Sequence, residues 1–98
     1  MKMRLHPEPF EQVKLGQKKI ECRLNDEKRQ QLAVGDVIEF QLRPECTEVI
    51  EKQICALHHF STFEEMFTKF PEERINNVYQ YYTTEGEQKW GVLAIEFK

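Results

Sequence analysis

At residues 16–23 the chain reads Gly16-Gln17-Lys18-Lys19-Ile20-Glu21-Cys22-Arg23, a segment that combines a helix end with the start of a strand. Gly16 follows the apolar positions Phe10 and Val13, so it is placed to end a short helix in the left-handed conformation. From residue 17 to residue 24 apolar and polar residues alternate, which predicts a strand with one face toward a core. The opposite face of this strand carries Lys19, Glu21 and Arg23.

The charged side chains of this segment have two interpretations. A lysine, a glutamate and an arginine held side by side form a polar group suited to binding a nucleobase or a phosphate. The same pattern is typical of an exposed strand whose charges are simply hydrated. Arg23 has the same two interpretations, since it can contact a phosphate in a bidentate manner or pair with Glu21.

The segment also contains the pattern Gly-x-Lys-x-x-Glu-x-Arg, formed by Gly16, Lys18, Glu21 and Arg23. This pattern resembles the signature of ASCH domains, which are small relatives of the PUA domain. Further blocks are similar to the same family in the same order, and the resemblance covers nearly the whole chain. These blocks are residues 5–10, 34–40, 81–82 and 90–96.

Periodicity along the chain predicts about five strands and two to three helices. The strands are expected at residues 1–5, 17–24, 37–42, 47–57 and 89–97, and the first helix at residues 9–15. A capping box at Ser61 predicts a second helix with an apolar stripe, and a short third helix follows. The stripe consists of Phe63, Met66, Phe67 and Phe70, the third helix includes Ile75, Val78 and Tyr82, and residues 83–87 are expected to form a turn.

These elements indicate an α+β fold in one domain spanning residues 1–98. The resemblance implies the specific form, a small PUA-like β-barrel with its helices packed over the ends and one flank. At this length the chain is too short for two independent cores.

The charge balance disfavours a protein that holds long nucleic acid. The net charge is −3, but residues 1–43 carry nine basic against seven acidic side chains, and residues 44–98 carry five against ten. A small basic-lined pocket in an acidic protein fits a nucleoside or a few unpaired nucleotides better than a duplex. A protein-interaction domain is a further interpretation of the acidic second half.

Composition also bears on cellular location and on metal binding. No apolar run approaches the ~20 residues of a membrane span, and three cysteines without a Cys-x-x-Cys pair suit a reducing compartment, so we expect a cytoplasmic protein without a membrane contact. His58 and His59 would point to opposite faces of a strand, so they are poorly placed to share a metal ion with Cys55. No cofactor fingerprint is present, and we expect neither a metal nor a cofactor. Nothing in the sequence indicates an oligomeric state.

Two functions follow for the charged segment. The first is binding of RNA or a modified nucleoside, with an aromatic residue as a stacking platform. The second comes from one branch of the family, which resembles an amidohydrolase acting on N4-acetylcytidine and has a catalytic lysine that matches Lys18. That branch has a threonine where this chain has Glu21, which would then assist catalysis, and a later glutamate that this chain could supply from Glu64, Glu65, Glu72 or Glu73. The residues expected to bind the ligand are Lys18, Glu21, Arg23, His6 and Tyr81.

Overall fold

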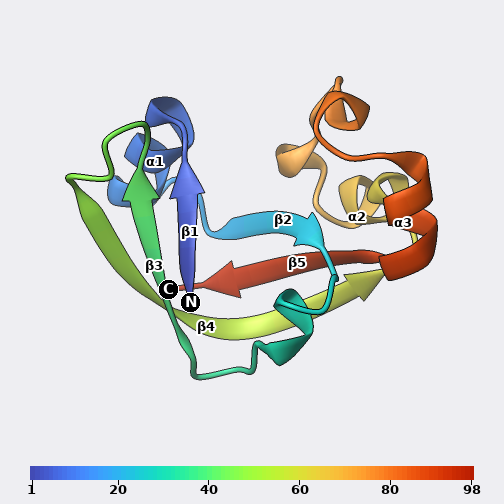
Figure 1. Cartoon of the computed structure of the whole chain (residues 1–98), viewed down its shortest axis with the longest axis horizontal. Helices are drawn as coiled ribbons and strands as arrows, with labels where there is room; N and C mark the ends of the chain where they lie inside the picture. Colours follow the sequence, from blue (N-terminus) through green and yellow to red (C-terminus); the bar gives the residue numbers. More distant parts are fainter.

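The computed structural model describes residues 1–98 and contains one five-stranded, curled sheet with three helices (Figure 1). The strands are β1 (Lys2–Leu5), β2 (Ile20–Leu24), β3 (Val37–Leu42), β4 (Val49–Phe60) and β5 (Val92–Phe97). The helices are α1 (Pro7–Lys14), α2 (Phe63–Lys69) and α3 (Thr84–Trp90), and three short 3-10 turns are η1 (Arg29–Gln31), η2 (Pro71–Glu73) and η3 (Val78–Gln80). The predicted α+β fold is confirmed, with the sheet curled into a half-barrel.

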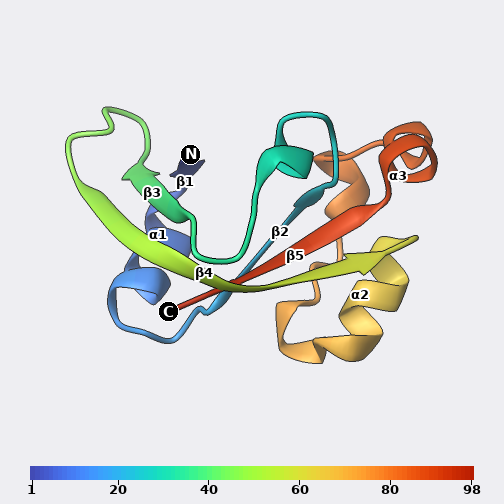
Figure 2. The ribbon, with the colours of Figure 1, turned by 90° about the horizontal axis from the view of Figure 1, so that it is seen from below.

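The longest strand, β4, runs the length of the molecule and organises the sheet (Figure 2). The strand order is β1-β3-β4-β5-β2, with β1 and β3 parallel and every other pair antiparallel. The first half of β4 pairs with β3, its second half pairs with β5, and the register shifts between Ile54 and Ala56. Strands β3 and β4, which follow each other in the chain, form an antiparallel hairpin. Strands β1 and β2 are the two edges of the curled sheet.

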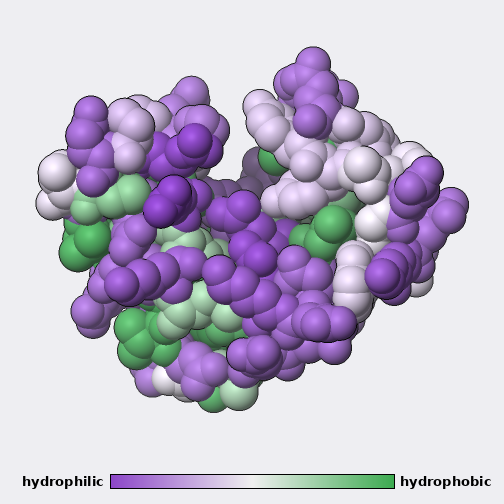
Figure 3. Space-filling model, in the orientation of Figure 1, coloured by the Kyte–Doolittle hydropathy of each residue, from purple (hydrophilic) through white to green (hydrophobic).

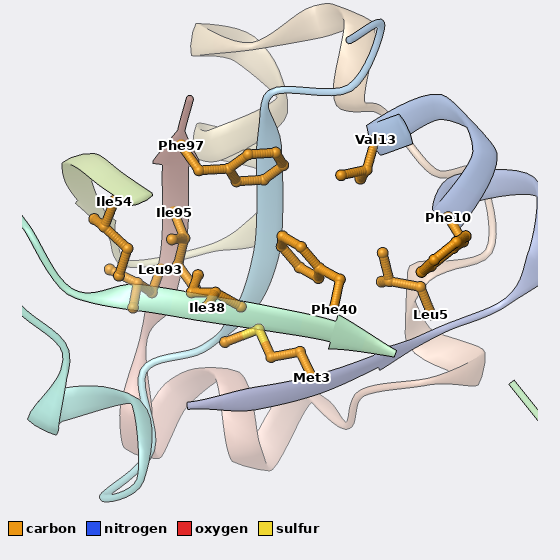
Figure 4. Packing of buried hydrophobic residues seen from close by; sticks show 10 residues of the cluster. All are labelled: Met3, Leu5, Phe10, Val13, Ile38, Phe40, Ile54, Leu93, Ile95 and Phe97. Carbon is orange, nitrogen blue, oxygen red and sulfur yellow. The ribbon is translucent and has the colours of Figure 1, made fainter. Parts of the chain in front are cut away.

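Strand β5 contributes to two hydrophobic cores. Its alternate residues Leu93, Ile95 and Phe97 pack with β1, β3 and α1 in the cluster shown in Figure 4. Val92 and Ala94 pack instead with β2 and α2. Both faces of β5 are buried because each faces a different layer of the molecule. The first core contains Met3, Leu5, Phe10, Val13, Ile38, Phe40, Ile54, Leu93, Ile95 and Phe97, and the second contains Ile20, Cys22, Phe63, Met66, Phe67, Val78, Val92 and Ala94.

The end of α1 fixes the start of the charged segment. Gly16 has φ +76°, and its N–H donates to the carbonyl of Val13 at 3.1 Å, so the predicted left-handed helix end is confirmed. The N–H groups of residues 17 and 18 both donate to the carbonyl of Gln12. These bonds keep residues 17 and 18 out of the sheet, and the strand predicted to begin at residue 17 begins at Ile20 instead.

The cap of α2 lies one residue later than predicted. Thr62, and not Ser61, is the N-cap, since its Oγ1 accepts from the N–H of Glu65 at 3.1 Å. The Glu65 carboxylate in turn accepts from the N–H of Ser61. The hydrogen-bond exchange of a capping box is therefore present, and the apolar stripe of this helix is buried as expected at Phe63, Met66 and Phe67.

Residues 75–91 differ most from the sequence prediction. The predicted third helix is reduced to η3, with Val78 buried and Ile75 exposed. The segment expected to be a turn is part of α3, which begins after Thr83, whose hydroxyl accepts from the N–H of Gly86. Because α3 extends to Trp90, β5 begins at Val92 and not at residue 89.

Candidate ligand-binding cleft

A cleft of about 650 Å³ lies between β1 and β3 on one side and residues 63–82 on the other. In Figure 3 it is a notch with strongly hydrophilic side chains over β1 and β3 and a less hydrophilic surface opposite. We call Lys18 and residues 21–23 the floor, the side with Arg4, His6 and Arg43 the polar wall, and the side with Ile75, Tyr81 and Tyr82 the aromatic wall. The other lining residues are Leu5, Glu8, Pro9, Gln12, Phe63, Phe67, Glu72, Glu73, Arg74 and Val78.

The charges of the floor are withdrawn from solvent. Glu21 is only 9% exposed, and its Oε2 lies 4.0 Å from Nη2 of Arg23. The alternative of a strand with hydrated charges is therefore wrong for this pair. Burial of a carboxylate and a guanidinium is tolerated only when each compensates the other, so the pair forms an electrostatic unit.

Arg23 connects the two walls of the cleft. Its Nη1 donates to Oη of Tyr82 at 3.4 Å, and its Nη2 donates to the backbone carbonyl of Arg4 at 3.5 Å. Burial opposes the charge of Arg23, but Glu21 and Tyr82 together outweigh it and raise the pKa of the guanidinium. Arg23 is therefore a permanent cation.

Two buried polar atoms of the floor have no hydrogen-bond partner. Oε2 of Glu21 and Nε of Arg23 are both buried and make no hydrogen bond, whereas Oε1 of Glu21 accepts from the N–H of Cys22 at 3.1 Å. Unsatisfied buried polar atoms are uncommon in folded proteins. One unsatisfied acceptor and one unsatisfied donor on neighbouring side chains are typical of a site that acquires its partners with a ligand or with water.

Lys18 is paired with a glutamate from a distant part of the chain. Its Nζ lies 3.3 Å from Oε2 of Glu73 in η2, and the two side chains are only 13% and 15% exposed. Of the four glutamates that the sequence left open, Glu64 is held by Arg74 at 2.9 Å and Glu65 caps α2. Glu72 lines the cleft without an ion pair.

The aromatic wall presents one tyrosine to solvent and holds the other inside. Tyr81 lines the cleft and is 63% exposed, so its ring is accessible to a ligand. Tyr82 stacks on Phe63 with ring centroids 5.1 Å apart and directs its hydroxyl to Arg23. Tyr82 therefore takes part in both the core, as its spacing indicated, and the cleft. His6, the N-cap residue of α1, is exposed on the polar wall.

Sequence reasoning missed several residues that the fold brings to the cleft. Arg4 lies in β1, Arg43 directly follows β3, and Arg74 follows η2. No local pattern marks these arginines, because their proximity depends on the pairing of β1 with β3 and on the path of residues 70–82.

Cys22 also reaches the cleft, but its thiol is inert. Burial is the main cause that raises its pKa to about 12, and the charge of Glu21 adds to the effect. Its Sγ lies 3.5 Å from Sδ of Met66 in the second core. A thiol with this pKa remains protonated near neutral pH and is a poor nucleophile.

Two further features concern metals and membranes. No cluster of three or more His, Cys, Asp or Glu side chains is arranged to hold a metal ion, and Nε2 of His58 instead lies 2.9 Å from Oε1 of Glu96. The helices are all too short or too polar to cross a lipid bilayer.

A family model described as the ASCH domain matches residues 3–98. The chain belongs to the ASCH family. The resemblance inferred from the motif and its flanking blocks is thus confirmed over essentially the whole chain. In this ASCH domain, Gly16 sets the turn before the floor, and the three charged motif residues line the cleft.

Two solved structures are similar to this ASCH domain over nearly their whole length. The crystal structure of hypothetical protein PH0355 is 34% identical with a TM-score of 0.83, covering 99% of this chain and 95% of that one. The solution NMR structure of protein PF0455 from Pyrococcus furiosus is 35% identical with a TM-score of 0.72, covering 100% of this chain and 96% of that one. Among curated proteins, none matches the chain.

Proposed function

We propose that this ASCH domain binds a nucleoside, or a single unpaired nucleotide of RNA, in the cleft. The observation that carries the proposal is that Lys18, Glu21 and Arg23 of the floor line the same cleft as the exposed Tyr81 ring of the aromatic wall. A nucleobase presents donors and acceptors on its edge and an apolar face above and below it. The floor offers both kinds of hydrogen-bonding group, and Tyr81 offers a stacking surface.

The size and charge of the cleft support a small ligand. A volume of about 650 Å³ falls within the range of pockets that enclose small molecules. The five basic and four acidic side chains that line it nearly balance, so recognition depends on paired hydrogen bonds more than on net charge. A base within a duplex would have to leave its stack to reach the floor.

A calorimetric titration with the four ribonucleosides and with short single-stranded RNA tests this proposal. The variant Arg23→Gln should weaken binding about tenfold or more, because a buried charge-assisted hydrogen bond contributes roughly 1.5–3 kcal/mol. Arg29→Gln is the matched control, since Arg29 is also half-buried and paired with a carboxylate but lies outside the cleft. Equal effects of the two variants, or no binding by the native protein, would contradict the proposal.

A second candidate function is hydrolysis of the acyl amide of an N4-acetylcytidine-like nucleoside. The pairing of Lys18 with Glu73 favours it, because a carboxylate can take the proton of an attacking water while an ammonium group stabilises the oxyanion. Water adds to the acyl carbon, the C–N bond breaks, and the exocyclic nitrogen leaves with a proton. The products are acetate and cytidine, and Glu21 would assist by orienting the water or the base.

Chromatography after incubation with N4-acetylcytidine distinguishes the enzyme from the binding protein. Hydrolysis should produce cytidine with the native chain and with Lys14→Ala, which breaks an exposed ion pair to Glu48 outside the cleft. Lys18→Ala and Glu73→Gln should each abolish product. If the native chain leaves the substrate intact while still binding nucleosides, the enzymatic candidate is excluded and the binding proposal stands.

A further inference from the structure

The basic side chains of the cleft fall into two groups by their partners. Lys18, Arg23 and Arg74 each form an ion pair with a glutamate. Arg4 and Arg43 form no ion pair at all, although both line the cleft. The basic side chains of the cleft that no carboxylate pairs with therefore lie on the polar wall.

The fold brings these two arginines to the paired ends of β1 and β3. Strands β1 and β3 are parallel, with Arg4 opposite Gln41, and the N–H of Arg43 donates to the carbonyl of Leu5 at 2.9 Å. Alternation along β1 directs Met3 and Leu5 into the first core and leaves Arg4 on the opposite face, and Arg43 directly follows the last residue of β3. Two neighbouring guanidinium groups that form no ion pair with a carboxylate suit the bidentate contacts that phosphate oxygens accept.

The polar wall is connected to the floor through Arg23, whose guanidinium contacts the Arg4 carbonyl on one side and the Tyr82 hydroxyl on the other. Arg4 and Arg43 line the same cleft as Arg23 and Tyr81, so one nucleotide can contact both the floor and the polar wall.

We propose that Arg4 and Arg43 form a phosphate subsite, so that the preferred ligand is a nucleotide or an RNA phosphodiester and not a free nucleoside. This inference rests on the proposed binding function and specifies its ligand class. A phosphate in this subsite would compensate charge that is unpaired in the free protein. Its contribution should weaken with increasing salt, whereas binding of the uncharged nucleoside should be nearly insensitive to salt.

The test compares cytidine, uridine, adenosine and guanosine with their 5′- and 3′-monophosphates by calorimetry at low and at physiological salt. The native protein should bind at least one monophosphate about tenfold or more tightly than its nucleoside, as expected for charge-assisted contacts. The position of the phosphate in the preferred ligand shows whether the 5′ or the 3′ oxygen leads to the polar wall.

The double variant Arg4→Gln/Arg43→Gln should bind monophosphate and nucleoside equally. The matched control is Lys2→Gln/Lys28→Gln, which removes the same charge from exposed side chains outside the cleft and should keep the preference. Equal affinity of the native protein for nucleoside and monophosphate overturns the inference, as does a preference that survives in the arginine double variant. Both results leave nucleoside binding in place, whereas the absence of binding by any of the twelve compounds overturns the proposed function and the inference together.

Discussion

Arg23 and Tyr82 meet across the floor of the cleft, 3.4 Å apart from Nη1 to Oη, although 59 positions separate them in the sequence. This contact joins an edge strand of the sheet to the segment that follows η3. Because the Arg4 carbonyl accepts from the other end of the same guanidinium, Arg23 is held from two sides. The orientation of the buried cation is therefore a property of the tertiary fold and not of β2 alone.

Removing the hydroxyl of Tyr82 should loosen Arg23 while leaving the core intact. Tyr82→Phe keeps the ring that stacks on Phe63, so we expect the free energy of unfolding to change by less than about 1 kcal/mol. Nucleoside affinity should fall roughly threefold to tenfold in calorimetry, since Arg23 must then be ordered by the ligand. Tyr81→Phe is the control and should bind normally, because its exposed ring is retained. Equal affinity of the native and Tyr82→Phe proteins would refute the positioning role.

The hydroxyl of Tyr79 donates to the buried carboxylate of Glu87, which also accepts from the N–H of Phe63 at 2.8 Å. The hydrogen bond to Glu87 is the main cause that raises the pKa of Tyr79 above its usual value of 10.0. A raised pKa in the folded state means that the stabilisation is complete below pH ~10 and is lost as the pH rises through the folded-state pKa.

The free energy of unfolding, measured by chemical denaturation, should therefore decrease between pH 8 and pH 11. This decrease should be smaller in Tyr79→Phe than in the native protein. An ultraviolet titration of the folded protein should also show one tyrosine ionising later in the native chain than in Glu87→Gln. Identical titration curves for the native protein and Glu87→Gln would show that the hydrogen bond does not form in solution.

The three cysteines should differ sharply in their reaction with a thiol reagent. Burial raises the pKa of the Cys22 thiol to about 12, whereas Cys46 and Cys55 are partly exposed. At pH 8 we expect two thiols to react quickly and the third only after unfolding. Mass spectrometry of the labelled peptides identifies which residue is protected, and labelling of Cys22 at the rate of Cys46 would contradict the structure.

Two glycines with positive φ should respond differently to alanine. Gly16 has φ +76° and open space where a Cβ would be, so Gly16→Ala should cost about 1 kcal/mol from backbone strain alone. At Gly91, φ is +73° and the new Cβ would lie 3.0 Å from the carbonyl oxygen of Phe60. Gly91→Ala should therefore cost about 2 kcal/mol or more. Urea denaturation measures the loss of unfolding free energy in both variants. An equal loss would mean that β4 and β5 shift apart at this point at little cost.

The elements with a strong periodic signal were predictable from the sequence. The alternation in residues 37–42 and the apolar stripe from Phe63 to Phe67 each report burial on one face, and burial is what stabilises those elements. Helix α3 lacks such a signal. Its sequence is polar, and its buried residue is Glu87, whose partners Phe63 and Tyr79 both lie outside the helix.

The same distinction applies to the cleft. Lys18, Glu21 and Arg23 were identifiable because one short segment carries them. The partner of Lys18 was not, since four glutamates lie within ten residues and only the path of η2 selects Glu73. The unpaired state of Arg4 and Arg43 likewise follows from which carboxylates the fold places out of reach.

The position of β5 between two cores has a consequence for synthesis in the cell. Residues 92–97 supply apolar side chains to both clusters, so neither cluster is complete until this strand is available. A nascent chain that has exposed residues 1–90 at the ribosome lacks the element that β2 and the second half of β4 both pair with. Cooperative folding must therefore wait for the strand to leave the exit tunnel. Until then the apolar side chains of both incomplete cores stay exposed to solvent and to other chains.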